Sequence, residues 1–207
     1  MIFARNQVLR ALLFLTLWCS SCYAEPMSKA FFLRYIEQMH SLEGDYYQTV
    51  TGRKERLISH SQGHVMYKQP GLFRWLSQEN TLLVNDGTSL WQYEPDLEQV
   101  IKTPIHDRDQ IFNPLILLGD VNALDKEYEI KAEEKSRHGA RFRLTPRSHS
   151  GTTISFVFRD EDLAAIEFQD NLQNINHIEL KHLQHNLAIA DSWFQFIPEE
   201  GTDIIEQ

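Results

Sequence analysis

The chain has 207 residues, of which 42% are hydrophobic, and a formal net charge of −9. This length is sufficient for one domain with a sizeable core. No basic run is visible, and affinity for nucleic acid depends on clusters of Lys and Arg displacing counterions. We therefore expect no nucleic-acid partner, and we expect a monomer.

The first 24 residues have the pattern of an export signal. Arg5 and Arg10 precede an apolar run, Ala11 to Trp18, and the small residue Ala24 precedes the expected cleavage site. The apolar run is about half of the roughly 20 residues that span a bilayer. We predict a signal peptide over 1–24 and one exported domain over 25–207. Removing two arginines and no acid lowers the formal charge from −9 to −11.

Both cysteines of the chain, Cys19 and Cys22, precede the expected cleavage site. No disulfide is therefore expected in the exported domain, and its stability must come from the burial of apolar side chains. An alternative is that Cys22 becomes a lipidated N-terminus. The residues before it lack the aliphatic residue that usually stands three positions upstream, which favours the cleaved form.

Two helices are predicted. The apolar residues from Phe31 to Met39 have the spacing of an amphipathic helix, with Ser28 as its N-cap. A second, short helix is predicted within 107–119, with Asn113 as its cap, proline at the first helical position and Gly119 just past its end. This second segment is apolar all round, so it must be covered on several sides or cover an apolar surface itself.

Most of the remaining chain alternates between apolar and polar residues, as β-strands do. The predicted strands are 46–51, 57–68, 72–77, 81–85, 89–94, 99–103, 128–134, 140–145, 152–159, 163–169 and 174–183, with 192–197 as one further candidate. About eleven strands with one helix before them and another inserted midway indicate an α+β fold with a strongly curved sheet.

Turn sequences separate the three short strands between Gln69 and Val100. The pair Asp86-Gly87 predicts a tight hairpin with a type I′ turn, in which both central residues need a positive φ. Pro70 has no N–H to donate to a neighbouring strand, so we expect it where a strand enters the sheet.

The same stretch carries a dense set of aromatic residues. Strand alternation places Phe73 and Trp75 on one face of their strand, and Trp91 and Tyr93 on one face of theirs. Such residues form either an ordinary sheet core or the lining of an apolar cavity. Periodicity does not distinguish these two interpretations.

No arrangement of residues indicates catalysis. The sequence has neither a Gly-x-Ser-x-Gly motif nor a glycine-rich phosphate loop. Its histidines include two close pairs, His60 with His64 and His182 with His185, but a zinc site needs three or four converging ligands. Surface positions fit these histidines better. We expect no enzymatic activity, no metal site and no cofactor.

Two segments of the aromatic stretch form a recognisable pattern: QPGLFRW at 69–75, and Asp86-Gly87 followed by WQYEPDLEQV at 91–100. With these segments the chain resembles the outer-membrane lipoprotein carrier family, LolA. Further matches in order and spacing lie at 31–50, 63, 113–118, 142–146 and 194–205, so the resemblance spans nearly the whole exported chain. It implies an incomplete, curved antiparallel β-barrel whose concave apolar cavity is covered by a lid of helices.

Members of this family accept acylated lipoproteins from an ABC transporter in the inner membrane. They shield the acyl chains across the periplasm and pass the cargo to a receptor lipoprotein at the outer membrane. The resemblance thus implies a periplasmic chaperone that binds no cofactor and is not an enzyme. It also implies a cargo-binding surface on the aromatic strands and the lid, formed by Phe73, Trp75, Trp91, Tyr93, Phe32, Ile36, Leu115 and Leu118.

One position departs from the family pattern. Many members carry an arginine before the proline that corresponds to Pro70, and this arginine holds the lid through hydrogen bonds to main-chain carbonyls. Here the residue is Gln69, which donates hydrogen bonds but has no charge. We therefore expect either a weaker lid latch at Gln69 or a latch that uses Lys68 or Arg74.

Three alternative functions stay open. A receptor lipoprotein of the same fold would be anchored through Cys22. A sensor domain would recognise misplaced lipoproteins and release no cargo, and such proteins usually carry a second domain. A lipid-acting enzyme such as an esterase would need a nucleophile that faces the cavity.

Overall fold

The computed structural model describes residues 27–105, 114–133, 138–148 and 151–206. Its helices are α1 (Lys29–Gln38) and α2 (Val121–Glu127), with short 3₁₀ turns η1 (Arg53–Glu55), η2 (Pro95–Leu97), η3 (Ile116–Gly119) and η4 (Asp191–Phe194). Its strands are β1 (Ser41–Thr51), β2 (Leu57–Lys68), β3 (Leu72–Ser77), β4 (Leu82–Asn85), β5 (Ser89–Glu94), β6 (Gln99–Pro104), β7 (Tyr128–Glu133), β8 (Gly139–Pro146), β9 (Ile154–Arg159), β10 (Asp162–Gln169), β11 (Ile175–His185) and β12 (Asp203–Glu206). No helix among the described residues has the length and apolar character needed to span a membrane.

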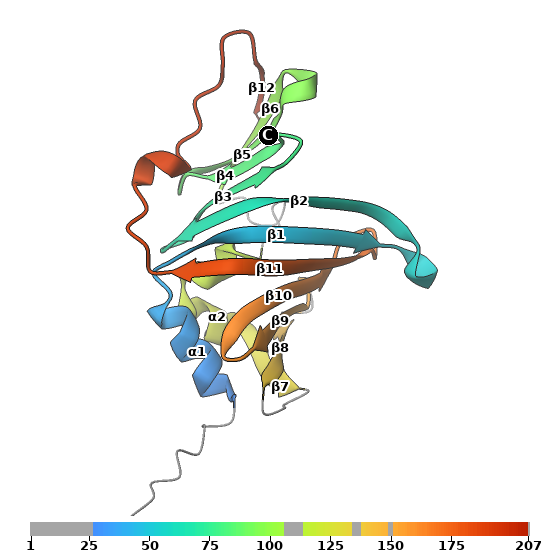
Figure 1. Cartoon of the computed structure of the whole chain (residues 1–207), viewed down its shortest axis with the longest axis vertical. Coiled ribbons are helices and arrows are strands. Elements are labelled where there is room, and N and C mark those ends of the chain that lie inside the picture. Colours follow the sequence, from blue (N-terminus) through green and yellow to red (C-terminus); the bar gives the residue numbers. More distant parts are fainter. Residues whose placement is uncertain (1–26, 106–113, 134–137, 149–150, 207) are drawn as a thin grey trace, which may run out of the picture.

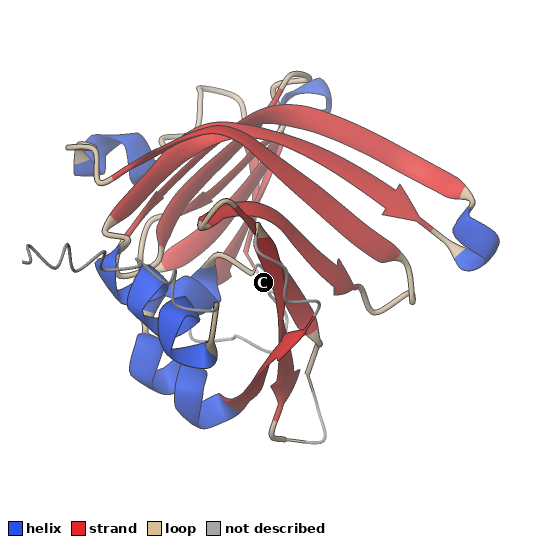
Figure 2. Ribbon diagram, turned by 60° about the horizontal axis from the view of Figure 1, so that its bottom comes forward, coloured by secondary structure: helices blue, strands red, loops and turns tan. Residues whose placement is uncertain are grey.

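The 12 described strands form one sheet, in the order β12-β6-β5-β4-β3-β2-β1-β11-β10-β9-β8-β7. The strand pairs are antiparallel except that β12 runs parallel to β6. β7 and β12 lie at opposite edges, so the sheet is open, and it arches over α1 and α2 (Figure 1 and Figure 2). The predicted α+β fold, an incomplete curved barrel with a helical lid, is confirmed.

The first helix begins where the sequence predicts. The Ser28 hydroxyl accepts a hydrogen bond from the Phe31 N–H at 3.2 Å, as an N-cap does. α1 then buries Phe32 and Ile36 completely, on the face that its spacing predicted.

The second helical region differs from the prediction. Asn113, its expected cap, lies outside the described residues, and the part that is described forms only η3. Gly119 allows a close approach, because a Cβ there would lie 2.5 Å from the Pro70 carbonyl oxygen. The next helix, α2, was not predicted, although the Asp120 carboxylate caps it by accepting from the N–H groups of Asn122 and Ala123, both at 3.0 Å.

The hairpin between β4 and β5 is present, but its turn is not of type I′. Gly87 has a φ of +91°, whereas Asp86 is not among the residues with positive φ. The Asp86 carboxylate instead accepts hydrogen bonds from the N–H groups of Thr88 and Ser89, both at 2.8 Å. The aspartate side chain thus stabilises a longer turn, as an Asx turn does. Pro70 precedes β3 by two residues, at the entry to that strand as expected.

The further strand expected over 192–197 is wrong. This segment contains η4, and the last strand is β12. Phe194 is 1% exposed, and Phe196 contacts the rings of Trp91 and Tyr93. The apolar pattern of this segment therefore reflects packing on the face of the sheet rather than pairing with an edge strand.

Candidate functional site

The concave face of the sheet carries a continuous apolar surface. Phe73 of β3 lies opposite Tyr67 of β2, and Trp75 lies opposite Val65, so these four side chains share one face. Phe73 is fully buried and Trp75 is half-buried. The Trp75 ring packs on that of Tyr46, with 4.4 Å between the ring centroids.

The helical lid is seated on this surface. The Phe32 ring lies 5.0 Å from that of Phe142 and 5.5 Å from that of Phe156, which are on β8 and β9. Leu115 and Leu118, from the η3 region, are 1% and 0% exposed. The structure gathers five of the predicted cargo-binding residues in one buried cluster, with Trp75 packed against it: Phe73, Phe32, Ile36, Leu115 and Leu118.

The other two predicted residues, Trp91 and Tyr93, do not join this cluster. On β4, Leu83 lies opposite Trp75, whereas its neighbour Val84 lies opposite Trp91. Adjacent residues of a strand point to opposite faces, so Trp91 and Tyr93 lie on the face away from Phe73. The expectation that all four aromatics belong to one cargo-binding surface does not fit this register, because β4 places the two aromatic pairs on opposite faces.

The C-terminal segment covers this opposite face of β3 to β6. Phe196 lies 5.6 Å from the Trp91 ring and 5.4 Å from the Tyr93 ring. Lys68 donates to the Ile189 carbonyl at 2.8 Å, and Arg74 donates to the Trp193 carbonyl at 3.5 Å. Both cations therefore hold the C-terminal segment. They do not replace the lid latch, in contrast to what their sequence positions suggested.

Gln69 contacts the lid directly. Its side-chain amide donates a hydrogen bond to the Ile36 carbonyl of α1, with 3.0 Å between Nε2 and the oxygen. Its Oε1 lies 3.3 Å from Nδ1 of His40. This hydrogen bond joins the β2–β3 turn to the end of α1. Because Gln69 is neutral, the hydrogen bond has no charge assistance.

A second polar contact holds α1 at Tyr35, the residue next to Ile36. The Tyr35 hydroxyl donates to the Asp162 carboxylate at 2.6 Å, and His185 Nε2 lies 2.8 Å from the same oxygen. Burial opposes the ionisation of Asp162, but the hydrogen bonds from His185 and Tyr35 outweigh it and lower the pKa of this carboxyl. The sequence predicted His185 on the surface, yet it supports this contact.

The other paired histidines lie on the outer side of the sheet. His64 lies 3.3 Å from the Asp45 carboxylate and 3.0 Å from that of Glu43, while His182 lies 2.8 Å from Asp45. The hydrogen bonds from His182 and His64 lower the pKa of Asp45. Within the described part of the chain, no group of three or more such side chains is arranged to hold a metal ion.

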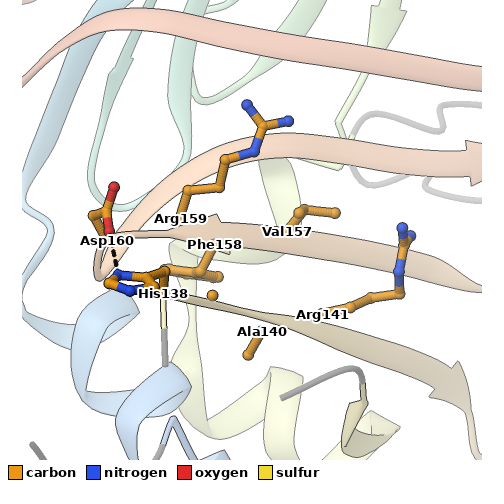
Figure 3. Close-up of a pocket in the computed structure, with 8 residues that line it drawn as sticks. His138, Ala140, Arg141, Val157, Phe158, Arg159 and Asp160 are labelled. Atoms are coloured by element: carbon orange, nitrogen blue, oxygen red, sulfur yellow. Dashed lines mark ion pairs between the residues drawn. The ribbon is translucent and has the colours of Figure 1, made fainter. Parts of the chain in front are cut away.

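Two surface hollows lie away from the lid. The first, of about 330 Å³, lies between β8 and β9, where His138 and Asp160 form an ion pair at 3.4 Å (Figure 3). Its two arginines are already paired, Arg141 with Glu167 and Arg159 with Glu179. The second, of about 400 Å³, is lined by polar residues of β1, β2 and β3.

The sheet is open and curved, its concave face is apolar, and a few polar contacts hold a helix over that face. These features define a carrier protein, in which a lid covers a binding surface. The chain belongs to the family described as outer membrane lipoprotein carrier protein LolA, whose model matches residues 37–197.

Curated relatives agree with this assignment. An outer-membrane lipoprotein carrier protein from Xanthomonas campestris pv. campestris (strain B100) is 30% identical over 177 residues, covering 83% of this chain and 84% of that protein. A protein of the same description from Xylella fastidiosa is 31% identical with the same coverage. Among solved structures, an uncharacterized conserved protein from Thermus thermophilus shares the fold, with a TM-score of 0.50 and 14% identity over 86% of this chain and 98% of that one.

Proposed function

We propose that this protein is a periplasmic chaperone for acylated lipoproteins. The observation that carries the proposal is the concave apolar face closed by α1, whose Phe32 and Ile36 are both 0% exposed in the closed state. The names of the curated relatives support the same function. The protein's task would be physical shielding, with no chemical step.

The energetics of lipid transfer explain why a lid is needed. Burying an acyl chain of about 16 carbons is worth on the order of 12 kcal/mol, at roughly 0.8 kcal/mol per methylene, so an acylated protein does not leave a membrane unshielded. A carrier must offer nearly equivalent burial and must also release its cargo. In the empty protein, the apolar side chains of α1 occupy the concave face. Cargo acyl chains would replace them, which keeps the net free energy of exchange small.

The lid contacts set how easily this exchange begins. Gln69 holds α1 through one neutral hydrogen bond to Ile36, and Asp162 holds it through the adjacent residue, Tyr35. A hydrogen bond to a charged group stabilises more than a neutral one. We infer that the Asp162 contact is the stronger of the two latches, and that both must break when cargo enters.

The cellular partners follow from the same proposal. Cargo would arrive from a lipoprotein-releasing ABC transporter of the inner membrane and leave to a receptor lipoprotein of the outer membrane. Residues 1–24 would be a cleaved export signal and residues 25–207 the carrier domain. Cys22, on which the alternative of an anchored receptor depends, lies outside the described residues.

Direct binding of a lipidated ligand tests the proposal. The chain beginning at Glu25 is mixed with a triacylated lipopeptide and, in parallel, with the same peptide lacking its acyl chains. We expect a soluble one-to-one complex with the acylated peptide alone. Equal retention of both peptides, or of neither, would contradict the proposal.

A further inference from the structure

Two hairpin turns meet at the end of the sheet that lies away from the lid. The β1–β2 hairpin turns through η1, and the β10–β11 hairpin turns through residues 170–174. Thr51 of β1 lies opposite both Leu57 of β2 and Ile175 of β11, so the two turns are neighbours (Figure 1). We call the residues Arg53–Ile58, Leu172 and Ile175 the hairpin tip.

The hairpin tip exposes a group of large apolar side chains. Leu57 is 57% exposed, Ile58 47%, Leu172 81% and Ile175 50%. A single exposed apolar residue needs no explanation. Four of them on two adjacent turns form a patch of the kind that marks an interaction surface.

The same tip carries positive charge. Arg53, Lys54 and Arg56 are exposed, and none of them forms an ion pair with another described residue. Glu55 is the one acid among them. The nearby Asp170 carboxylate stabilises its own turn by accepting from the Leu172 N–H at 2.9 Å. The three cations and Glu55 together give the hairpin tip a formal charge of +2 (three minus one), in a chain whose net charge is −9.

We propose that the hairpin tip binds the surface of a phospholipid bilayer that contains anionic lipids. Exposed apolar side chains enter the boundary between headgroups and acyl chains, while neighbouring cations interact with the phosphates. A bilayer that contains anionic lipids matches both the cations and the four apolar side chains of the tip. The acidic remainder of the chain is repelled by the same membrane, so the protein binds end-on through the tip.

The position of the tip is compatible with lid opening. β1 runs from the end of the sheet next to α1 to the tip, and the ten steps from Ser41 to Thr51 correspond to roughly 33 Å at about 3.3 Å per residue. Contact between tip and membrane therefore leaves α1 free to move. The proposal does not depend on cargo, because the empty protein has the same tip.

Vesicle co-sedimentation tests this inference. The chain beginning at Glu25 is mixed, without cargo, with phosphatidylcholine vesicles that either contain or lack phosphatidylglycerol. We expect binding to the vesicles with phosphatidylglycerol alone, and weaker binding as salt is raised. Absence of binding to anionic vesicles at low salt would overturn the proposal, whatever the result with lipopeptide cargo.

Two double variants of the tip separate the contribution of charge from that of apolar insertion. Arg53→Gln with Arg56→Gln should reduce the partitioning of the protein onto anionic vesicles about tenfold or more. Leu57→Asn with Leu172→Asn should also reduce it severalfold, since these side chains no longer favour the interface. Retention of full binding by either double variant would contradict the mechanism.

Matched controls come from surfaces outside the tip. Ile197, which is 82% exposed in the C-terminal segment, serves as the apolar control through Ile197→Asn. The double variant Lys126→Gln and Lys131→Gln serves as the charge control. It removes one exposed cation from α2 and one from β7. Both controls should bind like the unaltered protein. A loss equal to that of the tip variants would show that overall charge or hydrophobicity, rather than the tip, determines binding.

Discussion

The Tyr35 hydroxyl and the Asp162 carboxylate are 127 positions apart in the sequence and lie 2.6 Å apart in the structure. The contact joins α1 to β10, and His185 supports it from β11. Gln69, in the turn between β2 and β3, donates a hydrogen bond to the Ile36 carbonyl of the same helix. Polar groups thus fix α1 at the adjacent residues Tyr35 and Ile36, and apolar packing fixes it along its length.

Removing the Tyr35 hydroxyl should loosen the lid. Tyr35→Phe keeps the ring that packs on Phe158 at 4.8 Å but loses the donor to Asp162. Because the Asp162 side chain is 47% exposed, we expect a cost of about 1 kcal/mol, or roughly fivefold in the opening equilibrium. Hydrogen exchange of the α1 amides measures this change in the opening equilibrium. Tyr47→Phe, at a 38% exposed outer position, is the control, and equal exchange in both variants would contradict the latch.

The Asp162 latch should weaken in acid. The pKa of this carboxyl is lowered in the folded protein, so its contribution is fully present above the ordinary value of about 3.9 and is lost as pH falls through the lowered value. Asp162→Asn lacks this charge at every pH. The difference in unfolding free energy between the two proteins, measured by urea denaturation, should be largest near neutral pH and shrink in acid. A difference that does not change with pH would exclude this role.

A charged donor at position 69 should strengthen the lid. Gln69→Arg offers the Ile36 carbonyl a guanidinium in place of a neutral amide, and charge-assisted hydrogen bonds are the stronger class. We expect release of bound lipopeptide to slow by roughly threefold or more. The rate is followed by transfer to an excess of lipid vesicles. Gln69→Ala should speed release, and two rates equal to that of the unaltered protein would show that Gln69 is not a latch.

The two faces of the sheet should respond differently to loss of a tryptophan. Trp75→Ala removes apolar area from the concave face and should weaken lipopeptide binding by about tenfold. Trp91→Ala, a change of the same size on the face under Phe196, should leave binding unchanged. Phe73 is less suitable, since it is fully buried and its substitution would also destabilise the fold. A larger loss with Trp91→Ala would reverse the assignment of the faces.

Local sequence patterns were sufficient to predict much of the fold. β2, β3 and β5 begin and end where alternation and turn residues place them, and Ser28 caps α1 as predicted. These features depend on residues within a few positions of one another. The short helix α2 was missed because only seven residues follow its cap.

The site was less predictable because it depends on register and on distant contacts. Whether Trp91 faces Phe73 or points away is decided by how β3 and β5 pair with the four residues of β4. The partnership of Tyr35 with Asp162 and His185 links elements at opposite ends of the chain. No local pattern contains this information. The resemblance did direct attention to position 69, and the structure places the Gln69 amide on the Ile36 carbonyl, while the latch role stays a prediction.

The measurement that tests the central claim most directly is a release assay. Purified protein beginning at Glu25 is added to spheroplasts that synthesise a labelled outer-membrane lipoprotein, and the soluble fraction is examined for a complex of the two. The account predicts a soluble one-to-one complex that forms with this protein and not without it. No complex, under conditions in which a known carrier releases the same lipoprotein, would contradict the carrier function.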